Sequence, residues 1–204
     1  MIAWSIEAAI ESGCFDRVIV STDDNAIAEV AKKYGAEVLF IRPQELSDNF
    51  TGTIPVTKHG IESQGKVYDD IFCIYATAPL VTPNNIVKAY KQFKESKANY
   101  CFTAMNYAAH IQRAFKLNSN KRAEMLHPEL FNTRSQDLEE AYHNADWFYW
   151  GKSETFKKLI PVLSEDASPY ILPRYLVEDV DITDGWILAE LLYQVLHSKG
   201  ALDD

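Results

Sequence analysis

Two aspartates near the carboxyl end form the most suggestive chemical pattern in this sequence. Asp179 and Asp181 flank Val180 in the stretch 176–182, whose apolar start predicts a strand. Because side chains alternate along a strand, both carboxylates are expected on one face. Two convergent carboxylates can hold Mg²⁺ together with waters and the oxygens of a substrate triphosphate. Such a pair also occurs on solvated strand ends or as the cap of a following helix, so the pattern alone leaves both interpretations open.

Several arginine, amide and tyrosine side chains could bind an anionic or hydroxylated ligand. Arg42 stands where the apolar segment 37–41 gives way to a loop, and its guanidinium fork suits a base carbonyl or a phosphate. A second group suits a carboxylate and sugar hydroxyls, through bidentate and amide hydrogen bonds. It consists of Arg113, Arg134, Gln136 and Tyr142. The alternatives are a solvated arginine and an ordinary polar loop.

Other catalytic chemistries find little support in the sequence. The five histidines do not form H-E-x-x-H or another metal-binding spacing. The three cysteines contain no C-x-x-C pair, which argues against a disulfide framework and against a zinc site. No serine stands in a G-x-S-x-G setting, so a hydrolase triad is not favoured.

Composition limits the class of protein and its partners. The 204 residues are 47% hydrophobic and 24% charged, which is typical of one soluble globular domain, 1–204. No apolar run reaches the roughly 18 residues of a spanning helix, and no leader is visible, so we expect a cytoplasmic protein without membrane contact. A net charge of −9 argues against nucleic acid and favours small-molecule partners. An anionic substrate would then require local cations or a metal.

The elements that must position these residues alternate between strand and helix. Apolar runs predict strands over 17–22, 37–41, 70–76, 100–105, 147–151 and 176–182. Helical spacing and capping residues predict helices over 2–12, 26–34, 53–63, 86–96, 153–159 and 186–196. This alternation indicates an α/β fold with a parallel sheet. Ligands of such sheets bind at the carboxyl ends of strands, which makes the turn at Thr77 a candidate site edge.

The segment 106–144 interrupts this alternation. It is rich in aromatic, basic and amide residues, with a polar turn at 118–121 that predicts an inserted hairpin. A connection of this length inside a compact domain is usually functional or lies between subunits.

Six segments, in this order, resemble the acylneuraminate cytidylyltransferase family. They are Ile2-Ala-Trp-Ser-Ile-Glu-Ala-Ala, Val20-Ser-Thr-Asp-Asp, Tyr34-Gly-Ala-Glu-Val, Ile41-Arg-Pro-Gln-Glu-Leu, Thr77-Ala-Pro-Leu and Asp179-Val-Asp-Ile-Thr-Asp-Gly-Trp-Ile-Leu-Ala-Glu. The segment 132–143 and Phe148-Tyr-Trp-Gly are most similar to the branch of that family that acts on pseudaminic acid.

The resemblance implies a fold, a reaction and a set of site residues. The fold is a Rossmann-like, mostly parallel sheet flanked by helices, of the nucleotide-diphospho-sugar transferase type, with a small dimerisation excursion at 106–144. The reaction joins CTP and a nine-carbon 2-keto sugar acid to give the CMP-sugar and pyrophosphate, with Mg²⁺ on Asp179 and Asp181 and a homodimer as the working form. Nucleotide-side residues are Arg42, Thr53 and Thr77. Sugar-side residues are Tyr75, Arg113, Arg134, Gln136 and Tyr142.

Two departures from the family pattern affect these expectations. Tyr75 stands where the family typically has Gln, and Ala78 replaces a Ser, which is consistent with a sugar other than N-acetylneuraminate. The family also opens with a strand and a Gly- and Lys/Arg-rich loop around the triphosphate, and this sequence begins after them. We therefore expect weak or no catalysis from these 204 residues alone. N-acetylneuraminate and octulosonate remain alternative substrates, and a non-catalytic binding protein remains an alternative function.

Overall fold

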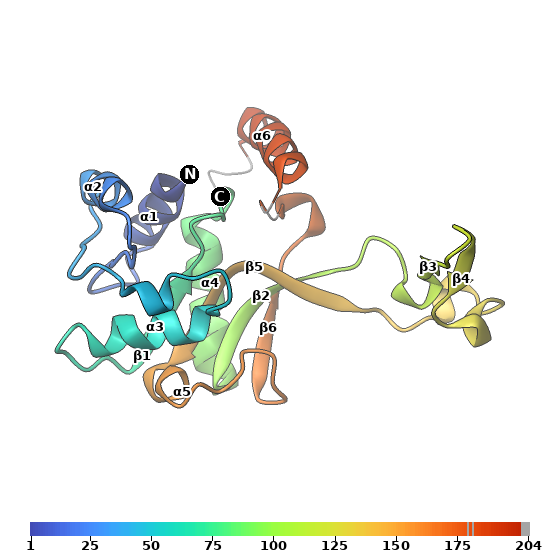
Figure 1. The fold of residues 1–204 in the computed structure, drawn as a ribbon, viewed down its shortest axis with the longest axis horizontal. Helices are drawn as coiled ribbons and strands as arrows, with labels where there is room; N and C mark the ends of the chain where they lie inside the picture. Colours follow the sequence, from blue (N-terminus) through green and yellow to red (C-terminus); the bar gives the residue numbers. More distant parts are fainter. Residues whose placement is uncertain (179, 181, 201–204) are drawn as a thin grey trace.

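A four-stranded sheet forms the centre of the molecule in the computed structural model, which describes residues 1–178, 180 and 182–200 (Figure 1). Its strand order is β1-β5-β2-β6. The strands are β1 (Asp70–Ile74), β2 (Tyr100–Asn106), β5 (Tyr142–Lys152) and β6 (Ala167–Ile171). β5 runs antiparallel to β1 and to β2, and β2 runs parallel to β6, so three of the four strands point the same way. The expected α/β class with a parallel-containing sheet is confirmed.

Helices cover both faces of this sheet. They are α1 (Ile2–Glu11), α2 (Asn25–Lys33), α3 (Thr53–Glu62), α4 (Pro83–Ser96), α5 (Ser153–Lys157) and α6 (Thr183–Ser198). Side chains of α1, α4 and α6 pack with Phe72, Phe148 and Trp150 in the largest core cluster. On the other face, α3 and α5 pack with Ile71 and Tyr100. The continuous apolar runs of the strands therefore serve two cores, as expected for strands covered on both faces.

Local capping explains where two of the helices begin. Asp24 accepts hydrogen bonds from the backbone N–H groups of Ala26 and Ile27 and so starts α2. Thr82 and Asn85 form a reciprocal capping box ahead of α4, with Pro83 at its first position. This cap places the start of α4 three residues before the expected start at residue 86.

Two predicted strands are extended segments with a single bridge. Residues 17–22 and 37–41 contact each other through a parallel bridge between Ile19 and Glu37 and through backbone hydrogen bonds, including Val20 N–H to the Glu37 carbonyl at 2.9 Å. Packing of Ile6 from α1 against Ala31 and Ala36 holds this region on one side of the sheet.

The carboxyl-terminal strand prediction was wrong for the residues that the structure describes. Residues 177, 178, 180 and 182 lie in no strand, and a short 3₁₀ helix, Arg174–Leu176, precedes them. A strand that was not predicted, β6, pairs with β2 on the side away from β5. Its sequence, Ala-Ser-Pro-Tyr-Ile, contains a proline and lacks an apolar run. Proline is tolerated there because β6 is an edge strand.

The segment 107–141 projects from one end of β2 and β5 as an arm, seen at the right of Figure 1. Within it, β3 (Phe115–Leu117) and β4 (Ala123–Met125) form a two-stranded hairpin, whose turn is held by the Asn118 side chain.

The remaining short 3₁₀ helices are Gln44–Leu46, Ile111–Arg113, Pro128–Leu130 and Ser135–Asp137. Among the described residues, no helix combines the length and apolarity of a membrane span.

Candidate active site

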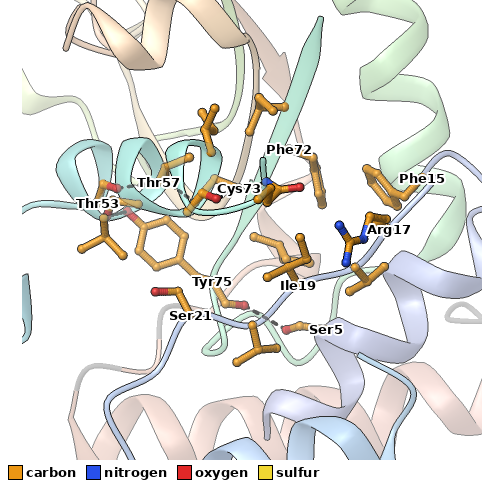
Figure 2. Close-up of a pocket in the computed structure, with 18 of the residues that line it drawn as sticks. Ser5, Phe15, Arg17, Ile19, Ser21, Thr53, Thr57, Phe72, Cys73 and Tyr75 are labelled. Atoms are coloured by element: carbon orange, nitrogen blue, oxygen red, sulfur yellow. Dashed lines mark hydrogen bonds between the residues drawn. The ribbon is translucent and has the colours of Figure 1, made fainter. Parts of the chain in front are cut away.

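A cavity of about 700 Å³ lies between the extended segment 17–22 and β1. Helix α1 and helix α3 contribute to its walls, through Ser5 and Thr57 among others (Figure 2). Phe15, Ile19 and Phe72 line its apolar part. β1 stands at one end of the strand order, so it is paired along one edge only within the described chain. The size is typical of a small-molecule site.

One end of the cavity, at the carboxyl end of β1, carries hydroxyl groups. Figure 2 places Ser21 and Tyr75 at this end, close to Thr53 at the start of α3. The Ser21 hydroxyl is buried and has no hydrogen-bond partner among the described residues. Buried polar atoms normally have partners, so an orphaned hydroxyl on a cavity wall points to a ligand. Ser21 was not among the expected site residues, although its position at the end of a predicted strand would have supported it.

Arg42 lines the same cavity in a fixed orientation. Its Nε donates to the Ser47 hydroxyl at 3.0 Å and its Nη2 donates to Asp23 at 3.1 Å, while its backbone N–H donates to the Thr22 carbonyl. The side chain is 22% exposed, so the guanidinium is accessible but not free to move. A cation held in this way can bind an anion without a large further loss of side-chain entropy.

The hydroxyls of Thr53, Tyr75 and Tyr149 form a continuous chain. The Tyr75 hydroxyl lies 2.7 Å from Thr53 Oγ1 and 2.7 Å from the Tyr149 hydroxyl. Tyr149 in turn contacts Asn144 and Asp146, each at 3.1 Å. Burial raises the pKa of Tyr75 and of Tyr149, so both keep their protons at neutral pH. Thr53 and Tyr75 were expected site residues, whereas the three residues of β5 behind them were not.

An ion pair closes the other end of the cavity. Arg17 donates to both carboxylate oxygens of Glu37, which joins the two extended segments. The hydrogen bonds from Arg17 lower the pKa of Glu37. Because both partners are satisfied by each other, this pair is part of the wall rather than an open anion site.

The expected site residues separate into three groups. Arg42, Thr53 and Tyr75 line the cavity, whereas Thr77 lies just beyond it on the turn after β1. Four residues lie on the arm or at its base, and none of them lines the cavity. They are Arg113, Arg134, Gln136 and Tyr142. Asp179 and Asp181 lie outside the described residues.

The arm side chains are engaged locally. Arg113 donates to the Thr133 carbonyl, Arg134 forms an ion pair with Asp137 at 2.7 Å, and Tyr142 donates to Glu140. Within the part of the chain that the structure describes, no group of three or more His, Cys, Asp or Glu side chains is placed to hold a metal ion.

The fold and a cavity at the carboxyl end of β1 are features of nucleotide-binding α/β enzymes. A solved structure of CMP:2-keto-3-deoxy-manno-octonic acid synthetase complexed with CTP shares this fold, with a TM-score of 0.65 over 97% of this chain and 88% of that chain, at 10% identity. The sequence profile of the Cytidylyltransferase family matches residues 1–162. The chain belongs to this family of enzymes.

Two relatives give context within the family. A pseudaminic acid cytidylyltransferase of Campylobacter jejuni is 40% identical over 202 residues, which are 98% of this chain and 87% of that protein. A CMP-N,N'-diacetyllegionaminic acid synthase of Legionella pneumophila is 26% identical over 206 residues, which cover 96% of this chain and 85% of that protein. The predicted resemblance to the acylneuraminate cytidylyltransferases is confirmed.

Proposed function

We propose that this protein transfers CMP from CTP to a sialic-acid-like, nine-carbon 2-keto sugar acid, with pseudaminic acid favoured, and releases pyrophosphate. The observation that carries the proposal is the 40% identity, over nearly the whole chain, to a pseudaminic acid cytidylyltransferase. The polar end of the cavity supports it, because a fixed arginine and several hydroxyls suit a phosphorylated and hydroxylated ligand pair. We expect the reaction to take place in the cytoplasm.

In the proposed reaction, the anomeric hydroxyl oxygen of the sugar acid attacks the α-phosphorus of CTP. The new bond joins that oxygen to phosphorus, and the bond from phosphorus to the bridging oxygen breaks in line with it. Pyrophosphate leaves with the electron pair, and the hydroxyl proton passes to solvent. Arg42 would bind and orient the nucleotide through its guanidinium, and Thr53 and Thr77 would position the nucleotide side of the complex.

Asp179 and Asp181 would hold the divalent metal, for which we propose Mg²⁺. Their alternate spacing matches the preference of Mg²⁺ for one or two protein carboxylates. Two acidic side chains that follow the extended segment 17–22 already have other partners: Asp23 pairs with Arg42 and Asp24 caps α2. The metal would supply charge neutralisation at the phosphates.

The arm supports a proposal of a homodimer. Phe115, Leu117 and Phe131 are 59%, 65% and 67% exposed on it, which is unusual for a contiguous small element of a monomer. Arg113, Arg134, Gln136 and Tyr142 are not among the residues that line the cavity, and the arm that carries the first three projects away from the sheet (Figure 1). They would therefore contact a sugar only in a site that the arm of a second copy completes, whereas Tyr75 would contact it from within the chain.

Pyrophosphate release tests the proposed reaction. The protein is incubated with CTP, Mg²⁺ and one of three acceptors: pseudaminic acid, N-acetylneuraminic acid or octulosonate. We expect the highest kcat/KM with pseudaminic acid. A preference for either other sugar would replace the assigned substrate. Release with none of the three, from these residues and from any longer chain that the gene encodes, would overturn the enzymatic proposal and leave a binding function.

The dimer is tested by the molar mass in solution. Phe131→Asp places a charge on the arm and should yield monomers by size-exclusion chromatography with light scattering. Leu163→Asp is the matched control, because Leu163 is 66% exposed and lies outside the arm. A monomeric wild type, or an unchanged dimer in Phe131→Asp, would contradict the arm interface.

A further inference from the structure

The side chain of Asp146 stands at the end of the hydroxyl chain that reaches the cavity. A carboxylate accepts hydrogen bonds and has no proton to donate. The contact of 3.1 Å between Asp146 Oδ1 and the Tyr149 hydroxyl is therefore donated by Tyr149. Asn144 also donates to Asp146 Oδ1, at 2.6 Å.

Tyr149 can consequently act only as an acceptor toward its other neighbours. Its single proton is used on Asp146, so its oxygen accepts from Asn144 Nδ2 at 3.1 Å and from the Tyr75 hydroxyl at 2.7 Å. The Asn144 amide has one orientation here, because its Oδ1 accepts from the Asp146 backbone N–H.

The direction of the hydrogen bonds is fixed in the same way as far as the cavity wall. The Tyr75 proton is used on Tyr149, so the contact of 2.7 Å with Thr53 is donated by the Thr53 hydroxyl. Both protons at the cavity end of the chain are therefore engaged within the protein. Thr53 and Tyr75 offer a ligand only lone pairs, and a ligand acceptor could bind there only by breaking the bond between them.

The backbone around Asp146 combines a positive φ with a shift in strand register. Asp146 has a φ of 49°, in the left-handed region that non-glycine residues rarely adopt. The pairing of β2 with β5 shifts register between Phe102 and Ala104, and Thr103 Oγ1 accepts from the backbone N–H groups of Trp147 and Phe148 in this bulge. Bulges re-aim side chains, and strained residues are retained where the surroundings require them.

We propose that Asp146 and Tyr149 are positioning residues. They fix the direction of each hydrogen bond in this chain of hydroxyls, which we call its proton order, so that Thr53 and Tyr75 select an N–H or O–H donor of a substrate. This inference rests on the proposed function for the identity of the substrates. The donor is either the exocyclic amino group of cytosine, which uracil replaces with an acceptor, or a hydroxyl or amide N–H of the sugar acid.

Tyr149→Phe tests the proton order with a minimal change of shape. The Tyr75 proton then loses its acceptor and is free to face the cavity, where it competes with a ligand donor. Binding of cytidine, uridine and pseudaminic acid is measured separately by titration calorimetry, which does not require turnover. Asp146→Gly is the second variant, because glycine adopts the left-handed conformation readily and removes the carboxylate.

The binding pattern decides both the inference and the source of the donor. We expect both variants to weaken one ligand class by about tenfold, the size of one hydrogen bond, and to leave the other unchanged. A fall in the ratio of cytidine to uridine affinity identifies the cytosine amino group. A weaker affinity for pseudaminic acid alone identifies the sugar.

A matched control separates this effect from the loss of any buried hydroxyl. Tyr100 is buried on the neighbouring strand, donates to the Ile160 carbonyl and does not line the cavity, so Tyr100→Phe should leave all three affinities unchanged. Affinities in Tyr149→Phe within twofold of wild type for every ligand, or equal losses in Tyr100→Phe, would overturn the inference. Absence of pyrophosphate release by the wild type concerns the proposed function, and the calorimetric ratios still decide the proton order.

Discussion

Gly151 in β5 offers the sharpest test of how tightly the sheet is packed beneath the candidate site. It pairs with Ile71 on one side and Tyr100 on the other. A Cβ added at this position would lie 2.6 Å from Cδ1 of Tyr100 and 2.7 Å from Cε2 of Phe156. Carbon atoms pack best at about 3.5–4.0 Å, so Gly151→Ala would require both rings to move by roughly 1 Å.

Neither ring has room to retreat. The Tyr100 hydroxyl is held by the Ile160 carbonyl at 2.9 Å, and the Tyr100 and Phe156 rings pack edge to face with centroids 5.1 Å apart. Overpacking of this kind costs about 1–3 kcal/mol. With a urea m-value of about 2 kcal/mol/M, the unfolding midpoint should fall by roughly 0.5–1.5 M.

At Gly60, unlike at Gly151, a substitution by alanine is expected to raise the stability of the protein. Gly60 lies within α3, and a Cβ there would meet only Phe40 Cζ at 3.9 Å, an ordinary contact. Gly60→Ala should raise stability by about 0.5–1 kcal/mol, because alanine favours the helix. Urea unfolding followed by far-UV circular dichroism measures both variants. A Gly151→Ala midpoint equal to that of wild type would refute the packing argument.

Three further predictions concern the candidate site. Arg42→Ala should raise the KM for CTP by roughly 10–100-fold, because a charge-assisted hydrogen bond is lost, and should change the KM for the sugar little. An effect confined to the sugar KM would assign Arg42 to the sugar instead of the nucleotide. Lys91→Ala serves as the control, because Lys91 is exposed. Asp181→Asn should lower kcat by about 100-fold or more in a Mg²⁺-dependent assay without shifting the unfolding midpoint, and full activity would exclude the metal role. Glu37→Gln should lower the free energy of unfolding above about pH 5. The reason is that a carboxyl whose pKa is lowered by Arg17 stabilises the fold when it is ionised. This contribution is lost as the pH falls through the lowered pKa. The urea midpoints of Glu37→Gln and wild type should thus converge as the pH falls through the lowered pKa of Glu37, and a constant difference would contradict the ion-pair argument.

Local sequence signals predicted most elements that bear the site. The apolar run at 70–76 contains β1, the Asp23-Asp24-Asn25 segment caps α2, and Thr53 starts α3 as expected. These features depend on neighbours a few residues away, so they can be read from spacing and residue type. Arg42 was placed at the end of an extended segment by the same reasoning, whereas Tyr75 was selected by the resemblance to the family, and both line the cavity.

The sequence alone therefore determined the α/β class and the family, and it indicated Arg42, Thr53 and Tyr75, which line the cavity. The tertiary structure decided that β6, which was not predicted, pairs with β2, and that the described residues of 176–182 lie in no strand. It also brought Tyr149 to Tyr75 across 74 positions and directed Asp146 toward them through a left-handed residue in a bulge. The physical reason is that periodicity reports which face of an element is apolar, whereas the partner of each edge and the direction of each hydrogen bond depend on long-range packing.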